Sequence, residues 1–190
     1  MSMNKAHRTL CSSRKWARLA EQRILPWALE GVELGEDVLE LGPGYGANLR
    51  VLVERVPQLT ALEIDGATAR RLERDWGGRA RILHGDASAM PLPDGGFSAV
   101  VCFTMLHHVP TSTLQDRLLA EAFRVLRPGG VFAGSDSQPT LPFRLLHLGD
   151  TMNVVGPEGF RARLTAAGFD DAVVDRDRRG HSIRFRARKR

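Results

Sequence analysis

The sequence predicts an α/β fold with a doubly wound, mostly parallel sheet of seven strands and helices on both of its faces. The main observation is that short apolar runs of strand length alternate with amphipathic stretches of helix length along most of the chain. In addition, the run "AVVCF" is apolar throughout, as in parallel strands that are covered on both faces. The last two runs are joined by a charged turn, so we expect an antiparallel strand at the C-terminal end.

The N-terminal helix is expected over residues 12–29, with Ser12 or Ser13 as its cap. Pro26 is expected to end or bend this helix, because proline has no amide hydrogen to donate. The residues expected on the buried face share helical spacing: Trp16, Leu19, Ala20 and Ile24.

Strands and helices then alternate through the middle of the chain. A capping-box pair, Ser112 and Gln115, is expected to open the third helix of this region, and the turn at Pro128 is expected to close it. Asp65 is expected to cap the second. The expected strands cover residues 37–41, 60–64, 80–83, 97–106 and 131–137, and the helices between them cover 47–56, 66–76 and 114–126.

The C-terminal part is expected to contain a helix over residues 157–168, then strands over 171–176 and 181–188. In the last strand, apolar residues alternate with arginines, which predicts one buried and one solvated face. A basic run can also indicate a nucleic-acid surface, so the net charge of +5 leaves that interpretation open.

Composition excludes several classes of protein. No segment approaches the ~20 consecutive apolar residues of a membrane helix, so no stable membrane insertion is expected. The first twenty residues contain basic side chains without an apolar block, so no secretory signal is expected and the predicted location is cytoplasmic. No Cys-x-x-Cys pair occurs, and no cluster of Asp, His and Asn has ligand spacing, so the sequence predicts no metal site.

The stretch "VLELGPGYGANL", residues 38–49, is the strongest local signal, because a glycine-rich turn joins a strand to a helix. Glycine allows positive φ and lets a ligand approach the backbone. A tight turn without a ligand is one interpretation, and a dinucleotide site is another, since "GPGYGA" fits G-x-G-x-x-A. Glu40 is poorly placed for a diphosphate and well placed for a ligand that carries an ammonium and a sulfonium group.

Four blocks in order, "VLELGPGYG", "ALEID", "LHGDASAMPLPDGGFSAVVCFTMLHHV" and "VLRPGGVF", resemble class I S-adenosylmethionine-dependent methyltransferases, a Rossmann-like family. The likeness is greatest to the type 11 group, which includes the ubiquinone and menaquinone C-methyltransferases. It covers residues 35–136 and implies S-adenosyl-L-methionine as cofactor and S-adenosyl-L-homocysteine as product. Ser98 departs from the family, which usually has aspartate there, and is expected to support loop geometry.

The resemblance implies roles for named residues. The methionine part of the cofactor would lie along Glu40 and the backbone of Gly42, Gly44 and Gly46. Glu63 would accept hydrogen bonds from both ribose hydroxyls, which suits a carboxylate with lone pairs for two donors. The remaining implied contacts are Asp86 and the Ala87 amide to the adenine, and Thr104 and Met105 beside the transferring methyl group.

Methyl transfer requires a general base only when the acceptor must lose a proton. The candidates are His107, His108, His147 and Asp136, although the two adjacent histidines could simply begin a loop. A small lipophilic or aromatic acceptor is predicted, because the N-terminal helix around Trp16 and Trp27 and the apolar segment 138–159 lie outside the shared blocks. That segment is either an apolar lid or is packed on the sheet.

A single domain is expected, as a monomer or homodimer: a helical segment 1–34, a cofactor-binding core 35–136, and an acceptor side with the last strands, 137–190. The alternative functions are an RNA methyltransferase, a non-catalytic nucleotide-binding protein and an NAD-dependent reductase. "ALEID" also resembles rRNA adenine dimethyltransferases, but their Asn-x-Pro-aromatic motif is replaced here by "CFTMLHHV". Nucleic acid is therefore not expected as the acceptor.

Overall fold

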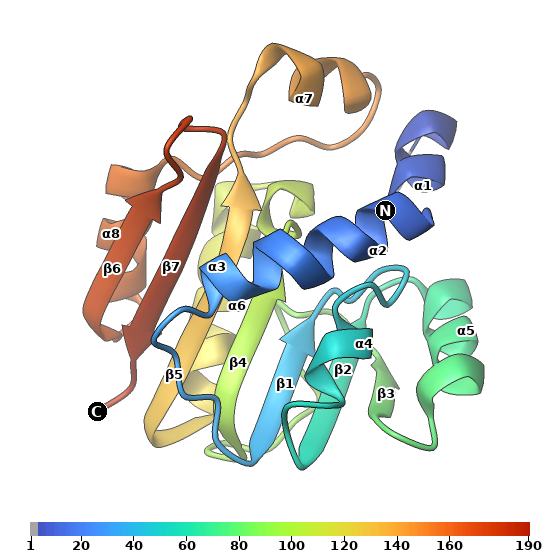
Figure 1. Ribbon diagram of the computed structural model, residues 1–190. Coiled ribbons are helices and arrows are strands. Elements are labelled where there is room, and N and C mark those ends of the chain that lie inside the picture. Colours follow the sequence, from blue (N-terminus) through green and yellow to red (C-terminus); the bar gives the residue numbers. More distant parts are fainter. Residues whose placement is uncertain (1–3) are drawn as a thin grey trace.

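The seven described strands form one mixed sheet in the order β3-β2-β1-β4-β5-β7-β6 (Figure 1). The computed structural model describes residues 4–190, so the first three residues of the expected N-terminal segment lie outside it. The pairs among β1 to β5 are all parallel, whereas β7 is antiparallel to both β5 and β6. The strands are β1 (Asp37–Leu41), β2 (Gln58–Glu63), β3 (Arg81–His84), β4 (Phe97–Phe103), β5 (Leu126–Ser137), β6 (Asp170–Arg176) and β7 (Ser182–Arg188).

Helices cover both faces of this sheet, as the sequence predicts. One face packs against α6 and α8, and the other against α3, α4 and α5. β4 at the centre is buried along its whole length, with Val100 and Cys102 in one core and Val101 and Phe103 in the other. The helices are α1 (Lys5–Cys11), α2 (Arg14–Leu19), the π-helix η1 (Ala20–Ile24), α3 (Leu25–Ala28), α4 (Leu49–Leu52), α5 (Gly66–Trp76), the 3-10 helix η2 (Leu106–His108), α6 (Ser112–Val125), α7 (Leu141–Leu146) and α8 (Pro157–Ala166).

The prediction that Pro26 ends or bends the N-terminal helix is wrong about the ending. Ser13 caps α2, and the chain stays helical to Ala28, with the wider π turn immediately before the proline. A π turn changes the hydrogen-bond spacing by one residue, so a proline can follow without the usual lost bond and ring clash. Of the residues predicted to face inward, Ala20 is buried as expected, whereas Leu19 is 42% exposed.

Two further local predictions are wrong. The helix expected over residues 47–56 contains only one regular α-helical segment, α4, with turns after it. The expected capping box also fails, because Thr111 is the cap of α6 and accepts from the Leu114 amide. Gln115 is fully buried instead, and its side-chain amide donates to the carbonyls of Leu106 and Asn153. It therefore joins distant segments and does not cap its own helix.

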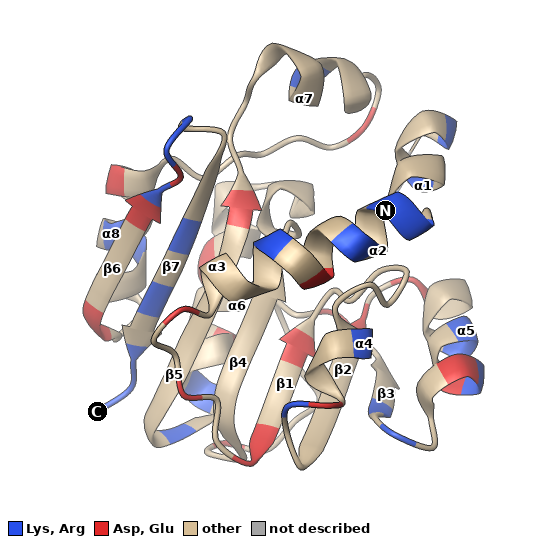
Figure 2. Cartoon of the chain, in the orientation of Figure 1, with Lys and Arg blue, Asp and Glu red and all other residues tan. Residues whose placement is uncertain are grey.

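The charged positions behave as expected at the C-terminal edge. Ile183, Phe185 and Ala187 are buried, while the arginines between them form basic bands along β7 (Figure 2). Arg184 is paired with Glu30 and Asp175, so part of this face is neutralised within the chain. Among the described residues, no helix has the length and apolarity needed to cross a membrane.

Candidate active site

The glycine-rich turn follows β1 and forms one wall of a cleft of about 540 Å³ at the carboxyl ends of the parallel strands. Gly42, Gly44 and Gly46 have φ values of +62°, +54° and +79°, a region that side chains disfavour. The turn is therefore sharp, and it also faces a hollow large enough for a small molecule.

The three glycines have different neighbours. A Cβ on Gly42 would lie 2.4 Å from Cγ of Met105, and one on Gly46 would lie 3.0 Å from a methyl carbon of Leu72. A Cβ on Gly44 would meet nothing within 4 Å, and this residue lines the cleft. Gly42 and Gly46 thus allow close packing, whereas Gly44 exposes bare backbone to the hollow.

Glu40 lies beneath this turn and is fully buried. Asn48, which lines the cleft, donates from Nδ2 to Oε1 of Glu40 over 3.0 Å, while Oε2 has no partner among residues 4–190. Burial raises the pKa of Glu40 to about 8; the Asn48 hydrogen bond opposes that rise and the nearby Glu63 adds to it. A buried carboxyl with a free oxygen, next to a cleft, is suited to a ligand that carries positive charge.

Glu63, at the end of β2, also lines the cleft and holds the turn in place. Its Oε2 accepts from the Gly44 amide over 3.0 Å, and its Oε1 accepts from the Asp65 amide over 2.9 Å. Each oxygen keeps a second lone pair, so the carboxylate can still accept from two hydroxyl groups. Asp65 caps α5 as predicted, accepting from the Thr68 amide.

Asp86, Ala87, Thr104 and Met105 line the same cleft, whereas Glu40 and Gly46, also implied by the resemblance, are not among its lining residues. Asp86 follows β3, and its Oδ1 accepts from the Ser88 amide over 2.8 Å, beside Ala87. Thr104 follows β4 with φ of +50°, and its amide donates to the carbonyl of Ser135. This strained residue turns the chain at the cleft wall.

Apolar side chains also line the cleft, and part of this apolar lining comes from the N-terminal helices, which lie over the strand ends (Figure 1). Trp16 lines the cleft as expected, together with Arg8, whereas Trp27 does not and instead lies beside Arg184. No residue of 138–159 is among the lining residues. The other apolar lining residues include Cys11, Phe103, Met105, Val109, Pro110, Leu114 and Leu118.

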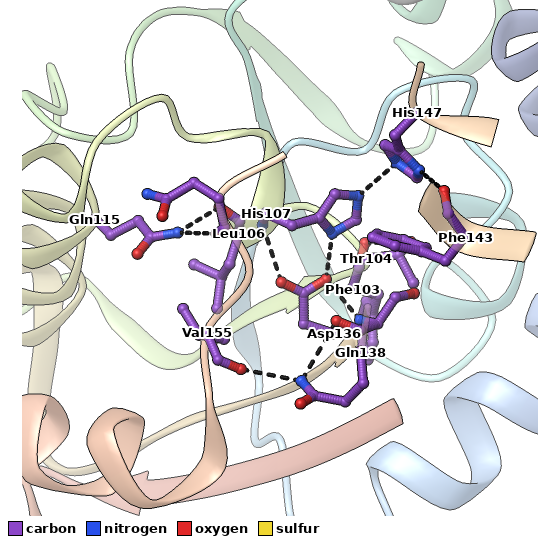
Figure 3. Close-up of polar contacts among 12 residues, drawn as sticks. Phe103, Thr104, Leu106, His107, Gln115, Asp136, Gln138, Phe143, His147 and Val155 are labelled. Atoms are coloured by element: carbon purple, nitrogen blue, oxygen red, sulfur yellow. Dashed lines mark hydrogen bonds and ion pairs between the residues drawn. The ribbon is translucent and has the colours of Figure 1, made fainter. Parts of the chain in front are cut away.

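The four candidate bases are brought together, but only His108 lines the cleft. His107 is buried and bonded to Asp136: its backbone amide donates to Oδ2 over 2.9 Å, and its Nδ1 contacts Oδ1 over 2.5 Å (Figure 3). Its Nε2 lies 3.2 Å from Nε2 of His147. Burial lowers the pKa of His108 to about 2, aided by the neighbouring histidines.

Two residues of this group, His7 and Asp150, were not identified from the sequence. His7, on α1, is buried against His108 and His147, and its Nδ1 lies 2.9 Å from Oδ2 of Asp150. No local pattern indicates this contact, because the partners are 143 positions apart.

Ser98 holds the loop before β1, as expected: its Oγ donates to the Leu34 carbonyl and accepts from the Asp37 amide.

Residues 39–134, about half of the chain, match the family model of the methyltransferase domain. The chain therefore belongs to this family, that of the S-adenosylmethionine-dependent methyltransferases. It is 35% identical over 153 residues to a probable S-adenosylmethionine-dependent methyltransferase of Mycolicibacterium smegmatis, covering 73% of this chain and 57% of that protein. A fatty-acid O-methyltransferase of the same organism is 36% identical over 109 residues, covering 55% of this chain and 38% of that protein.

The chain thus spans about half the length of the curated relatives it matches. Among solved structures, a protein from Pyrococcus horikoshii aligns over 100% of both chains with a TM-score of 0.79 at 18% identity. Such a likeness shows the fold, and it confirms the Rossmann-like arrangement predicted from the sequence.

Proposed function

We propose that this chain binds S-adenosylmethionine in the cleft and catalyses methyl transfer to a small lipophilic acceptor whose reacting group is an ionised carboxylate. The observation that carries the proposal is the mixed lining of the cleft. Carboxylates and bare backbone line it together with apolar side chains and one arginine among the described residues, Arg8, from α1.

The carboxylates and the bare backbone suit the cofactor. S-adenosylmethionine, when bound, supplies a methyl group on a positively charged sulfur that is a good leaving group. Glu63 has lone pairs for the ribose hydroxyls, and Gly44 allows the ligand to approach the main chain. Beneath the turn, the free oxygen of Glu40 favours the positive charge, and Asp86 and the Ala87 amide, which line the cleft, would bind the adenine.

The apolar lining and Arg8 suit an acceptor with an apolar body and one negative charge. Val109, Leu114 and Leu118 offer hydrocarbon surface, which favours an aliphatic chain or a ring. Arg8 is exposed and lines the same cleft, and a guanidinium binds a carboxylate with strong, charge-assisted hydrogen bonds. The fatty-acid O-methyltransferase among the relatives acts, by its name, on an acceptor of this kind.

An ionised acceptor also agrees with the histidines. A general base works best with a pKa near the working pH, and the pKa of His108, about 2, is far below it. His107 is bonded to Asp136 and is not among the lining residues. A carboxylate needs no base: its oxygen lone pair forms the new bond to carbon, the carbon–sulfur bond breaks, and that electron pair stays on sulfur. The role of the protein is then to align the two groups and exclude water.

The test measures label transfer from S-adenosylmethionine carrying a labelled methyl group. Decanoic acid, decanol, a phenol, a quinol and RNA serve as acceptors. We expect the methyl ester of the acid as the main product. The substitution Arg8→Gln should raise KM for the acid roughly tenfold or more, as expected for the loss of a charged hydrogen bond. Arg178→Gln, in the exposed turn after β6, is the matched control.

Label on RNA or on the alcohol, with none on the acid, would contradict the proposed acceptor while leaving the cofactor assignment in place. Calorimetric titration with S-adenosylmethionine, S-adenosylhomocysteine and NAD tests the cofactor separately. Binding of NAD alone would overturn the methyl-transfer proposal and favour the reductase alternative.

A further inference from the structure

Three buried histidines from three separate segments meet beside the cleft. They are His7 on α1, His108 in η2 and His147 immediately after α7, with 3%, 8% and 4% of their surface exposed. One ring nitrogen from each lies within 4.8 Å of the other two. A buried imidazole nitrogen costs free energy unless it has a hydrogen-bond partner or binds a metal ion. The converging nitrogens of these three rings therefore need such a partner.

In two of the three rings, one nitrogen already has a partner. Nδ1 of His7 contacts a carboxylate oxygen of Asp150, and Nδ1 of His147 lies 2.8 Å from the carbonyl oxygen of Phe143 (Figure 3). A carboxylate and a carbonyl only accept, so these two Nδ1 atoms carry the hydrogen. In a neutral ring, Nε2 of His7 and of His147 then presents a lone pair.

His107 lies next to this group of rings. Its Nδ1 contacts Oδ1 of the Asp136 carboxylate, and its Nε2 lies 3.2 Å from Nε2 of His147. A metal cation among the three converging imidazoles would bind the ring lone pairs that face it.

We propose that His7, His108 and His147 bind a divalent transition-metal ion of the zinc type. Imidazole nitrogen suits zinc, copper, iron and nickel, and three protein ligands leave one position for water. Metal-binding histidines almost always donate their other N–H to a carboxylate or a carbonyl, as His7 does to Asp150 and His147 does to Phe143.

The spacing is compatible with this ion after a small closure. Nitrogens bound tetrahedrally at about 2.0–2.1 Å lie about 3.3 Å apart. The three nitrogens are at most 4.8 Å apart, so each ring needs to move by about 1 Å or less. The bound ion would link α1, the loop after β4 and the end of α7. This inference goes beyond the proposed methyl transfer and does not depend on it.

The test is a titration of tag-free full-length chain with Zn²⁺, followed by calorimetry and native mass spectrometry. We expect one equivalent of zinc per chain. The substitutions His7→Ala and His147→Ala should each weaken binding more than tenfold, since each removes one of three ligands. His181→Ala is the matched control, because His181 is exposed at the turn between β6 and β7. That variant should bind zinc as the parent chain does.

A second variant keeps the test decisive if the alanine variants do not fold. Asp150→Asn still offers an oxygen to Nδ1 of His7 but lacks the negative charge, so it should fold and bind zinc about 10- to 100-fold more weakly. Absence of one-equivalent binding in the parent chain, or binding that neither His147→Ala nor Asp150→Asn weakens, would overturn the inference. Neither readout uses S-adenosylmethionine, so failure here leaves the proposed function untouched.

Discussion

At the scale of single residues, Glu63 in the lining of the cleft and Glu40 beneath the glycine turn differ in their surroundings. Glu63 satisfies two backbone amides with its two oxygens, whereas Glu40 has one side-chain donor and one free oxygen in a fully buried position. Glu63 therefore shapes the turn directly. The burial of an ionised Glu40 is unfavourable, and a positively charged ligand nearby reduces that cost.

Replacing Glu63 tests the first role. In Glu63→Gln, an NH₂ group must face one of the two backbone N–H donors, so one of these partly buried bonds is lost. The cost of about 1–3 kcal/mol should weaken S-adenosylmethionine binding roughly 5- to 150-fold in calorimetry. Glu158→Gln, exposed in the first turn of α8, is the control. Equal affinity in both variants would show that Glu63 does not form the site.

The pH dependence of the free energy of unfolding tests the role of Glu40. Its pKa is raised from 4.5 to about 8 in the folded chain, so between these values the native state binds more protons than the unfolded state. Stability should therefore fall as pH rises through this window. In Glu40→Gln, which cannot ionise, denaturant titrations from pH 5 to 8 should show a smaller decline. An unchanged slope would mean that Glu40 is ionised at no cost.

The same carboxyl should make cofactor binding pH-dependent. A positively charged ligand favours the ionised form of Glu40, so binding releases a proton below about pH 8. Affinity for S-adenosylmethionine should then increase from pH 6 to 8 and level off above that. Calorimetry in buffers of different ionisation enthalpy measures the released proton, and Glu40→Gln should abolish most of it. A proton release that persists in this variant would assign it to another group.

At the scale of elements, the glycine-rich turn separates packing from ligand contact. Gly46→Ala places a methyl group against Leu72 on α5 at φ of +79°, so it should destabilise the fold by about 1–3 kcal/mol. Gly44→Ala meets no neighbour and should cost less, but its methyl group enters the cleft. Denaturant unfolding should therefore rank Gly46→Ala as the less stable variant, while calorimetry should rank Gly44→Ala as the weaker cofactor binder. The reverse ranking would contradict this division.

The elements also show which features the sequence could predict. Strands such as β4 are covered on both faces, so nearly all their residues are apolar and the strand is recognisable in the sequence as an apolar run. The glycine turn is likewise local, and so are Glu40, Glu63 and Asp86, each at or near a strand end. The π turn before Pro26 could not be predicted, since the wider turn leaves no distinct residue pattern. The capping-box prediction for Gln115 was wrong because its side chain bonds to Asn153, 38 positions away, and not to the backbone at the start of α6.

The histidine cluster could not be predicted for the same reason. His107 and His108 were candidates because they follow β4, but His7 and Asp150 join them only because α1 contacts the segment after α7. A search for ligand spacing along the sequence detects clusters held by one or two elements. Three histidines from α1, η2 and the end of α7 leave no such spacing.

At the scale of the whole molecule, the N-terminal helices α1 and α2 form the cover of the cleft, which Arg8, Cys11 and Trp16 line. This cover is held by contacts between α1 and the segment after β5. Nδ2 of Asn4 donates to the carbonyls of Leu146 and Leu148, and the Asn4 amide donates to Asp150. The same side chain caps α1 by accepting from the His7 amide. One residue thus supports both α1 and its attachment to α7.

Asn4→Ala should therefore loosen both segments together. Losing a cap costs about 1 kcal/mol and each hydrogen bond about 0.5–1.5 kcal/mol, so amide hydrogen exchange in α1 and around α7 should accelerate roughly tenfold or more. Exchange in β1 and β4 should not change, because those strands lie in the buried cores. KM for the acceptor should rise while cofactor affinity is retained. Thr9→Ala is the control, since Oγ1 of Thr9 bonds only to the Lys5 carbonyl within α1. Faster exchange in α1 alone would show that the two segments are not coupled and that α7 does not help to hold the cover closed.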